Sequence, residues 1–114
     1  MSATSQISDA QMIQSLARLD ERDVRALTRP MDIYADDPET RGPHEVAVYH
    51  EGRRHIVNYD VRFCDCADFH YRGDICQHIR RVEFAFGGRE IPNGINEEAL
   101  DDELRQRLAE RDVL

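Results

Sequence analysis

The stretch CDCADFHYRGDICQH, residues 64–78, contains all three cysteines of this 114-residue chain and two of its five histidines. Within it, Cys64, Cys66, Cys76 and His78 form the pattern C-x-C-x9-C-x-H. Three thiolates and one imidazole are the ligand set of a structural, tetrahedral zinc site, in which no coordination position stays open for catalysis. The stretch therefore predicts one Zn²⁺ per chain, bound by these four residues.

Three alternatives to this zinc site have to be weighed. The cysteines could be ordinary buried residues and His78 a surface residue, but their coincidence in one short window argues against this. Three thiolates can also bind iron. His70, four residues after Cys66, is an alternative ligand, although a histidine in such a loop is more often exposed. The remaining histidines have no metal-binding spacing with the cysteines and are predicted to lie at the surface: His44, His50 and His55.

The cysteines are poorly suited to disulfides. Three cannot all pair with one another, and a bond between Cys64 and Cys66 would be strained. Thiols that bind metal are typical of a reducing cytoplasm. No run approaches the roughly 18 apolar residues of a membrane span, and the first ten residues lack the basic and apolar parts of a secretory signal. We expect a soluble, cytoplasmic protein that does not enter membranes.

The chain is acidic and contains no lysine. Its 23 Asp and Glu residues outnumber its 15 arginines, and the formal net charge is −8. Such a composition is expected of a halophilic organism, because dense carboxylates keep proteins soluble in a salty cytoplasm; a GC-rich genome that favours arginine codons is the alternative. Residues 53–82 carry six arginines against four acids, whereas residues 1–52 and 83–114 each have a net charge of −5. The predicted zinc segment is therefore the basic part of the chain.

A β-hairpin is predicted before the zinc ligands. Residues 45–50 and 55–59 are rich in β-branched and aromatic side chains, and Gly52 between them suits the turn. Val61 and Phe63 continue the alternation up to Cys64. The second strand should therefore deliver the first two ligands at its end.

A helix is predicted after the loop that follows Cys66. Gly73 permits the reversal that brings the chain back to the metal. Apolar residues at helical spacing from Ile75 to Phe86 then predict a helix, which Gly87-Gly88 ends. Its start carries the last two ligands. Two ligands on a hairpin and two on a helix make a ββα zinc unit over residues 45–86.

Helices are also predicted on both sides of this unit. A capping box of Ser8 and Gln11, with Ile7 stapled onto Met12, starts an N-terminal helical segment over residues 8–29. Asp20 with Asp23 looks like a second capped start, so this segment either breaks there or bends. Residues 31–34 are a weak strand candidate, and residues 35–43 read as a loop.

The C-terminal helix is predicted over residues 95–112. Asn96 caps it, and Leu100, Leu104 and Leu108 share one face. Residues 1–114 then form a single α+β domain. Its centre is a hairpin or small antiparallel sheet plus a helix around the zinc site, flanked by N-terminal and C-terminal helices.

The residues from Cys64 to Val82 resemble a SWIM-type zinc finger. That family has C-x-C, a loop with a phenylalanine and often Arg-Gly, and then C-x-H before an apolar position. Here these loop and apolar positions hold Phe69, Arg72-Gly73 and Ile79. The resemblance covers roughly residues 45–86 and implies zinc at the four ligands, with Phe69 and Ile79 packed beside it. The proline that usually follows the second cysteine is absent, which should not affect metal binding because proline is no ligand.

The resemblance implies a binding function. Members of the family bind DNA or other proteins, often as parts of transposases, chromatin remodellers or recombination mediators, and similar small stand-alone members occur in salt-loving archaea. We expect no enzymatic activity and no small-molecule substrate. The predicted metal site is closed, and the sequence has no phosphate-binding glycine loop and no nucleophile motif.

Two functions compete on the sequence alone. In the first, which we favour, the chain is a protein-interaction adapter in DNA-related processes. Its leucine-rich C-terminal helix would dock on a partner or on a second copy as a homodimer, although such a stripe is as often part of the chain's own core. In the second, the chain binds DNA directly through arginines predicted to be exposed around the finger: Arg53, Arg54, Arg72, Arg80 and Arg81. Acidic flanks and high salt would weaken such phosphate contacts. Arginines near the ligands could instead donate hydrogen bonds to the thiolates: Arg62, Arg72 and Arg80.

Overall fold

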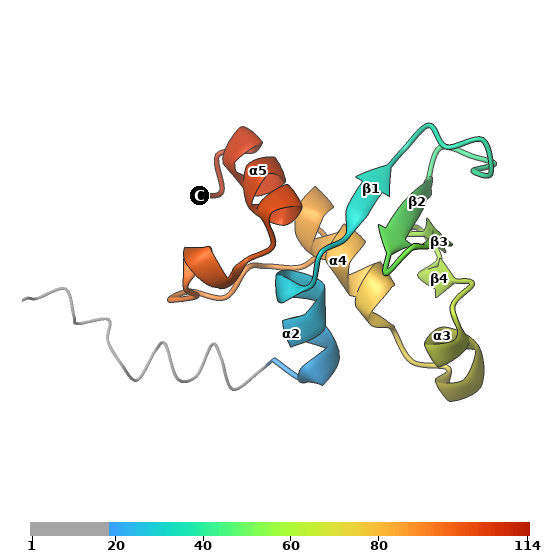
Figure 1. Cartoon of the computed structure of the whole chain (residues 1–114), viewed down its shortest axis with the longest axis horizontal. Helices are drawn as coiled ribbons and strands as arrows, with labels where there is room; N and C mark the ends of the chain where they lie inside the picture. Colours follow the sequence, from blue (N-terminus) through green and yellow to red (C-terminus); the bar gives the residue numbers. More distant parts are fainter. Residues whose placement is uncertain (1–18) are drawn as a thin grey trace, which may run out of the picture.

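The computed structural model describes residues 19–114, and Figure 1 shows how the elements of this part are arranged. The described elements are α2 (Glu21–Thr28), β1 (Asp32–Tyr34), β2 (Glu45–His50), β3 (Arg53–Asn58), β4 (Phe63–Cys64), α3 (Ala67–Arg72), α4 (Gln77–Phe86), the 3₁₀ turn η2 (Glu97–Ala99) and α5 (Asp102–Glu110). The four strands form one antiparallel sheet in the order β1-β2-β3-β4. The predicted α+β class is thereby confirmed.

The hairpin of β2 and β3 follows the prediction closely. His50 pairs with Arg53, so the loop consists of two residues, Glu51 and Gly52. Their φ angles are 53° and 77°. Positive φ at both positions is the geometry of a type I′ turn, which matches the twist of the flanking strands. Gly52 reaches this region without steric cost.

The second strand does not run on into the zinc ligands, so this prediction was wrong. The chain leaves β3 after Asn58, reverses, and returns antiparallel as β4, where Cys64 pairs with Val57. The Asn58 side chain accepts hydrogen bonds from the backbone N–H groups of Asp60 and Val61, at 3.0 and 3.2 Å. Such side-chain bonds offer the backbone an alternative to the strand ladder. Cys64 therefore comes from a fourth strand.

Helix α2 begins where the second capped start was predicted. Asp20 is its N-cap and accepts from the backbone N–H of Asp23, and the Asp23 side chain accepts from the N–H of Asp20. This reciprocal capping box satisfies two donors that the helix start leaves free. The capping box predicted at Ser8 and Gln11, the staple from Ile7 to Met12 and the apolar stripe before Leu19 lie outside the described residues.

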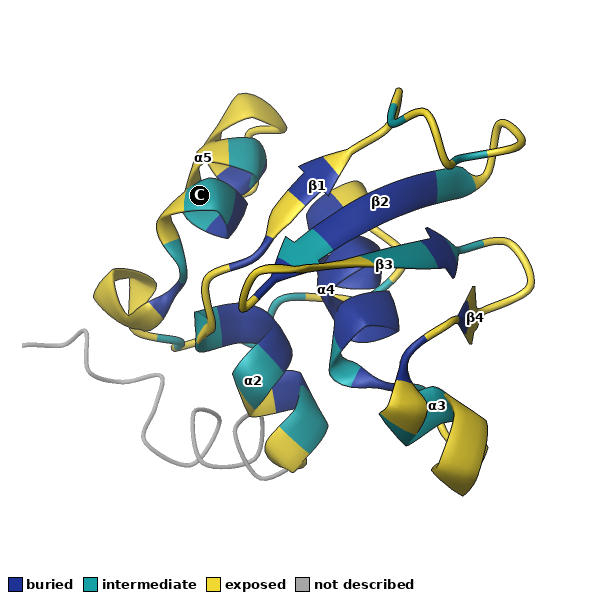
Figure 2. Cartoon of the chain, turned by 45° about the vertical axis from the view of Figure 1, so that its right-hand side comes forward, coloured by how far each residue is buried: buried dark blue, intermediate teal, exposed yellow. Residues whose placement is uncertain are grey.

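Helix α4 is the central element of the core. Residues 78–85 are all buried, and Figure 2 shows this dark-blue helix behind the sheet. Helices α2 and α5 contact it, as do β3 and β4. Gly87 ends the helix with a φ of 95°, as predicted from Gly87-Gly88. Side chains from both ends of the described chain thus meet on the helix that carries two zinc ligands.

The C-terminal leucines are part of this core. Leu104 and Leu108 are fully buried and Leu100 nearly so. The face predicted to dock on a partner or a second copy is therefore covered by the chain's own core residues, which is the alternative left open by the sequence. Asn96 caps η2, and α5 itself begins after Asp101. No helix in the described residues is long and apolar enough to cross a lipid bilayer.

Candidate metal centre

The four predicted ligands come together in a buried cluster. Their ligand atoms all lie within 4.8 Å of one another. Nδ1 of His78 lies 3.8 Å from Sγ of Cys64 and 3.8 Å from Sγ of Cys76. A tetrahedron with zinc–sulfur bonds of about 2.3 Å places neighbouring donors about 3.8 Å apart. The size and donor set of the cluster fit one zinc ion, with Nδ1 as the histidine donor.

Each ligand sits at the end or the beginning of an element. Cys64 ends β4, and Cys66 is the N-cap of α3, where its Sγ accepts a hydrogen bond from the backbone N–H of Phe69 at 3.4 Å. Cys76 is the N-cap of α4, and His78 lies in the first turn of that helix. Helix N-termini carry partial positive charge, which stabilises thiolates. The sequence predicted a loop where α3 forms, but Gly73 reverses the chain with a φ of 65° as expected.

The three thiols influence one another strongly. The Cys66 sulfur accepts hydrogen bonds from the thiols of Cys64 and Cys76, and these bonds lower the pKa of Cys66. The same bond raises the pKa of the donor Cys64. Several thiolates in so small a cluster would repel one another at close range. A divalent metal removes this conflict by neutralising the thiolates.

Comparison with known proteins gave a match only for the part of the chain that contains the four ligands. Residues 55–87 match the family model of the SWIM zinc finger. We call these residues the SWIM segment. They include β4, α3, α4 and all four ligands, so the resemblance inferred from the sequence is confirmed for the finger itself. Comparison with curated proteins and with solved structures gave no match for the chain.

Two more histidines belong to the surroundings of the SWIM zinc ligands, although the sequence placed them at the surface. His50 is only 7% exposed, and its Nδ1 lies 3.2 Å from Nε2 of His78. The ring of His55 stacks on the ring of His78, with 4.1 Å between centroids. Burial lowers the pKa of both His50 and His55. His50 therefore stays neutral near pH 7 and can accept a hydrogen bond.

A sequence signal for these histidines exists. Alternate residues of a strand point to the same side of a sheet. His50 shares its side with the buried Val46 and Val48, and His55 shares its side with the buried Val57. Both imidazoles therefore point toward the core side, where α4 presents His78. The other two histidines are exposed, as predicted: His44 and His70.

The arginines predicted to offset the thiolate charge pair with carboxylates instead. Arg62 binds Glu83 through two hydrogen bonds of 2.8 and 3.2 Å. Arg72 lies 3.4 Å from Asp68, and Arg80 lies 2.7 Å from Asp20. The hydrogen bonds of the described residues include none from these arginines to sulfur. Carboxylates on α3, on α4 and at the N-cap of α2 lie close enough to pair with these arginines.

Two of the five arginines predicted to contact nucleic acid are buried. Arg80 is 6% and Arg81 0% exposed. Arg81 donates to the carbonyl oxygens of Ala26, Arg29 and Met31 and pairs with Asp101 and Glu103. The prediction that both lie on the exposed side of α4 was wrong. The acidic flanks fold onto the basic stretch of residues 53–82 and neutralise these arginines inside the molecule.

The other three arginines differ in how they are engaged. Arg54 pairs with Asp37 and Glu39 at 3.4 Å each, and Arg72 with Asp68. Arg53 is exposed and has no ion pair among the described residues. The local positive charge of residues 53–82 therefore does not become one continuous basic surface.

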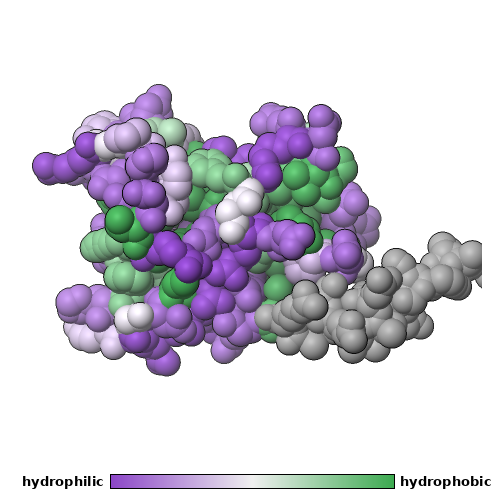
Figure 3. All heavy atoms as spheres, turned by 180° about the vertical axis from the view of Figure 1, so that it is seen from behind, coloured by the Kyte–Doolittle hydropathy of each residue, from purple (hydrophilic) through white to green (hydrophobic). Residues whose placement is uncertain are grey.

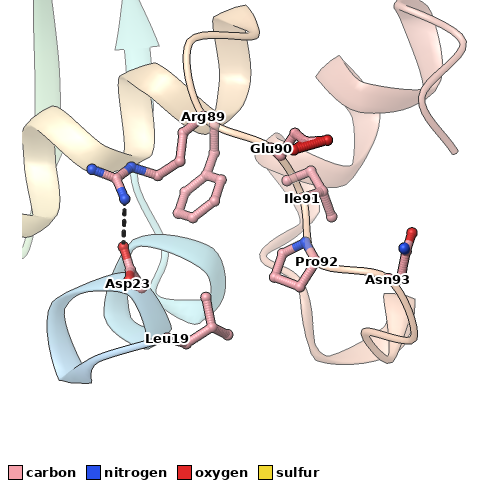
Figure 4. A pocket seen from close by; sticks show the side chains of 8 residues that line it. Leu19, Asp23, Arg89, Glu90, Ile91, Pro92 and Asn93 are labelled. Atoms are coloured by element: carbon pink, nitrogen blue, oxygen red, sulfur yellow. Dashed lines mark hydrogen bonds and ion pairs between the residues drawn. The ribbon is translucent and has the colours of Figure 1, made fainter. Parts of the chain in front are cut away.

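A separate cavity of about 220 Å³ lies between α2 and the linker after α4. Figure 4 shows Asp23 and Arg89 joined across one side of it, with Ile91 and Pro92 opposite. The ion pair measures 3.3 Å and ties α2 to the linker. Leu19, the first described residue, also lines the cavity. Its lining does not include the zinc ligands.

Proposed function

We propose that this chain is a zinc-stabilised adapter that binds a partner protein in DNA-related processes and has no catalytic activity of its own. The proposal rests on the observation that Arg80 and Arg81 form ion pairs inside the molecule. Arg80 and Arg81, which a direct DNA binder would present to phosphate, hold α2 and α5 onto α4. DNA affinity depends largely on cations that can reach the phosphates.

The zinc centre supports a structural role in this proposal. Three cysteines and one histidine fill a tetrahedron, so no metal-bound water is available for attack on a substrate. When bound, the ion would join β4, α3 and the start of α4 into one rigid unit. Such a unit can hold an exposed surface in a fixed shape.

The cellular setting of the proposal rests on the thiols and on the family of the SWIM segment. The three ligand cysteines are free, and they must stay reduced to bind zinc. We therefore place the adapter in the cytoplasm. The association of SWIM-type zinc fingers with DNA transactions supports a partner from that kind of process.

Direct DNA binding remains the second candidate, because Arg53 is exposed and Arg72 is mostly exposed with one weak partner. These two side chains could contact phosphates without unfolding the core. The net charge of −8 opposes this function at long range. Contacts of this kind would also weaken steeply with salt.

The test combines purification from the host with DNA binding. Tagged full-length protein, loaded with zinc, is purified from its own host at native salt, and the zinc-loaded chain is assayed by mobility shift on duplex and single-stranded DNA at low and high salt. The proposal expects a stoichiometric protein partner and no sequence-selective shift. Arg53→Gln/Arg72→Gln is compared with Arg29→Gln/Arg41→Gln, two exposed arginines outside the SWIM segment. Selective binding at high salt that only the first double variant abolishes would establish the DNA function instead.

A further inference from the structure

Helix α3 and strand β4 carry an aromatic surface beside the zinc ligands. Phe63 is 42% and Tyr71 82% exposed. The rings of Phe63 and Phe69 meet edge to face with 5.4 Å between centroids, and His70 contacts Tyr71 in the same manner at 4.9 Å. We call these four residues the aromatic surface. Exposed aromatic side chains grouped in this way are typical of protein interfaces.

A hollow of about 650 Å³ lies in this surface, and the first two zinc ligands, Cys64 and Cys66, also line it. Its lining includes all four aromatic residues together with Asp65 and Gly73. Figure 3 shows the molecule from behind, with a mostly hydrophilic face and smaller apolar areas. Apolar side chains and a concave shape together provide room for a partner's side chain.

Among the side chains of α3, that of Phe69 packs against the core and is partly buried. This helix has no buried residue, yet three of its six residues are aromatic or histidine. It is attached at its start by Cys66, and Arg22 of α2 holds its Asp68 through bonds of 2.8 and 3.1 Å. A six-residue helix is too short to be stable alone. Zinc and this ion pair therefore fix a helix whose outward face is available for contact.

The charged groups in and below the hollow indicate which kind of partner would bind there. Asp65 is its only carboxylate, with a side chain 49% exposed, and no arginine lines it. Zinc with three thiolates would place a formal charge of −1 directly beneath. Of the two arginines next to it in sequence, Arg62 pairs with Glu83 and is about half exposed, and Arg72 pairs with Asp68 and is mostly exposed. Phosphates would meet negative charge here, whereas a cation would find a carboxylate and exposed ring faces.

We propose that the aromatic surface docks a basic segment of a partner protein, with an arginine or lysine side chain over the ring of Tyr71 or Phe63 and close to Asp65. The inference rests on the adapter function proposed above and names the partner's chemistry. Guanidinium and ammonium groups are attracted to aromatic ring faces. Direct contacts of this kind persist at high salt better than long-range attraction does, since screening acts mainly on separated charges.

The test uses three probes on the full-length, zinc-loaded, ¹⁵N-labelled protein. They are an octapeptide that alternates arginine and leucine, the same peptide with glutamate in place of arginine, and oligothymidine. Saturable amide shifts confined to β4 and α3 with the arginine peptide alone are expected. No saturable shift with that peptide overturns the proposal. Shifts of the same amides by the glutamate peptide or by oligothymidine overturn it as well, the latter in favour of nucleic acid.

The binding test also uses variants of exposed residues, because replacing an exposed side chain leaves the fold intact. Tyr71→Ala and Asp65→Asn should each weaken binding of the arginine peptide at least about fivefold, and Tyr71→Phe should retain it, because the ring provides the attraction. Asn at position 65 keeps an oxygen for the backbone N–H of Ile56, which Asp65 now holds at 3.1 Å. The matched control is Tyr34→Ala, which removes a tyrosine that is 50% exposed on β1. Unchanged zinc content and circular dichroism show that each variant is folded.

The same variants separate this inference from the adapter function. If a host protein copurifies with the wild type and is lost with Tyr71→Ala and Asp65→Asn, both hold. If it copurifies equally with these variants, docking occurs elsewhere and only this inference fails. If no protein copurifies at all, the adapter function fails and this inference falls with it.

Discussion

Nδ1 of His50 lies 3.2 Å from Nε2 of His78, the imidazole that faces the three cysteine sulfurs with its other nitrogen. With a metal ion on Nδ1 of His78, Nε2 of that ring would carry the proton and donate it in a hydrogen bond to Nδ1 of His50. A hydrogen bond on the far side of a ligand imidazole fixes its tautomer and its ring orientation. His50 thus belongs to the zinc site although it touches no metal.

Replacing His50 with Ala is expected to lower zinc affinity about 10- to 100-fold, because the ring of His78 loses the acceptor that orients it. His50→Asn should retain most of the affinity, since its side-chain oxygen can take the place of Nδ1. Competition with a chromophoric chelator measures the zinc affinity of both variants. His44→Ala, an exposed histidine, is the control. Equal affinity of His50→Ala and wild type would mean that the bond does not support the metal.

Metal removal is expected to loosen α3 before the rest of the chain. Native mass spectrometry should first show one zinc per chain, and Cys76→Ser should lose it. Hydrogen exchange with and without chelator should then show the largest gain in α3, which has no buried residue, and a smaller gain in α4, which is buried through residues 78–85. Uniform exchange across both helices would contradict this order.

Arg81→Met is expected to destabilise the zinc-loaded protein by about 3–5 kcal/mol, because Asp101 and Glu103 lose a buried partner. Urea unfolding measures the change. Arg53→Met, at an exposed position, should stay within about 0.5 kcal/mol of wild type. A small effect at position 81 would show that the buried ion cluster adds little to stability.

Leu104→Ala is expected to cost about 2–5 kcal/mol without changing the oligomeric state, because this fully buried leucine packs in the chain's own core. Denaturant unfolding and sedimentation velocity are measured on the same samples. Val113→Ala, at a 42% exposed position, serves as control. If the variant instead dissociates an oligomer at unchanged stability, the leucine face is an interface after all.

Local patterns predicted local structure well. The hairpin with Gly52 in its turn, the helix that ends at Phe86 and the reversal at Gly73 all depend on residues close in sequence. The failures have a different origin. The strand expected to reach Cys64 was interrupted by the side-chain bonds of Asn58, and α3 went unpredicted because its helical start is capped by the ligand Cys66.

The sequence by itself determined the metal site. Four ligands within 15 residues are brought together by one hairpin, one reversal and one helix start, so their spacing alone specifies the donor set. Only the tertiary structure decided what surrounds that site. Arg80, Arg81 and the C-terminal leucines became interior residues because partners 20 to 60 positions away fold against them. Such long-range pairing depends on how whole helices and strands pack, so a local sequence pattern does not predict it.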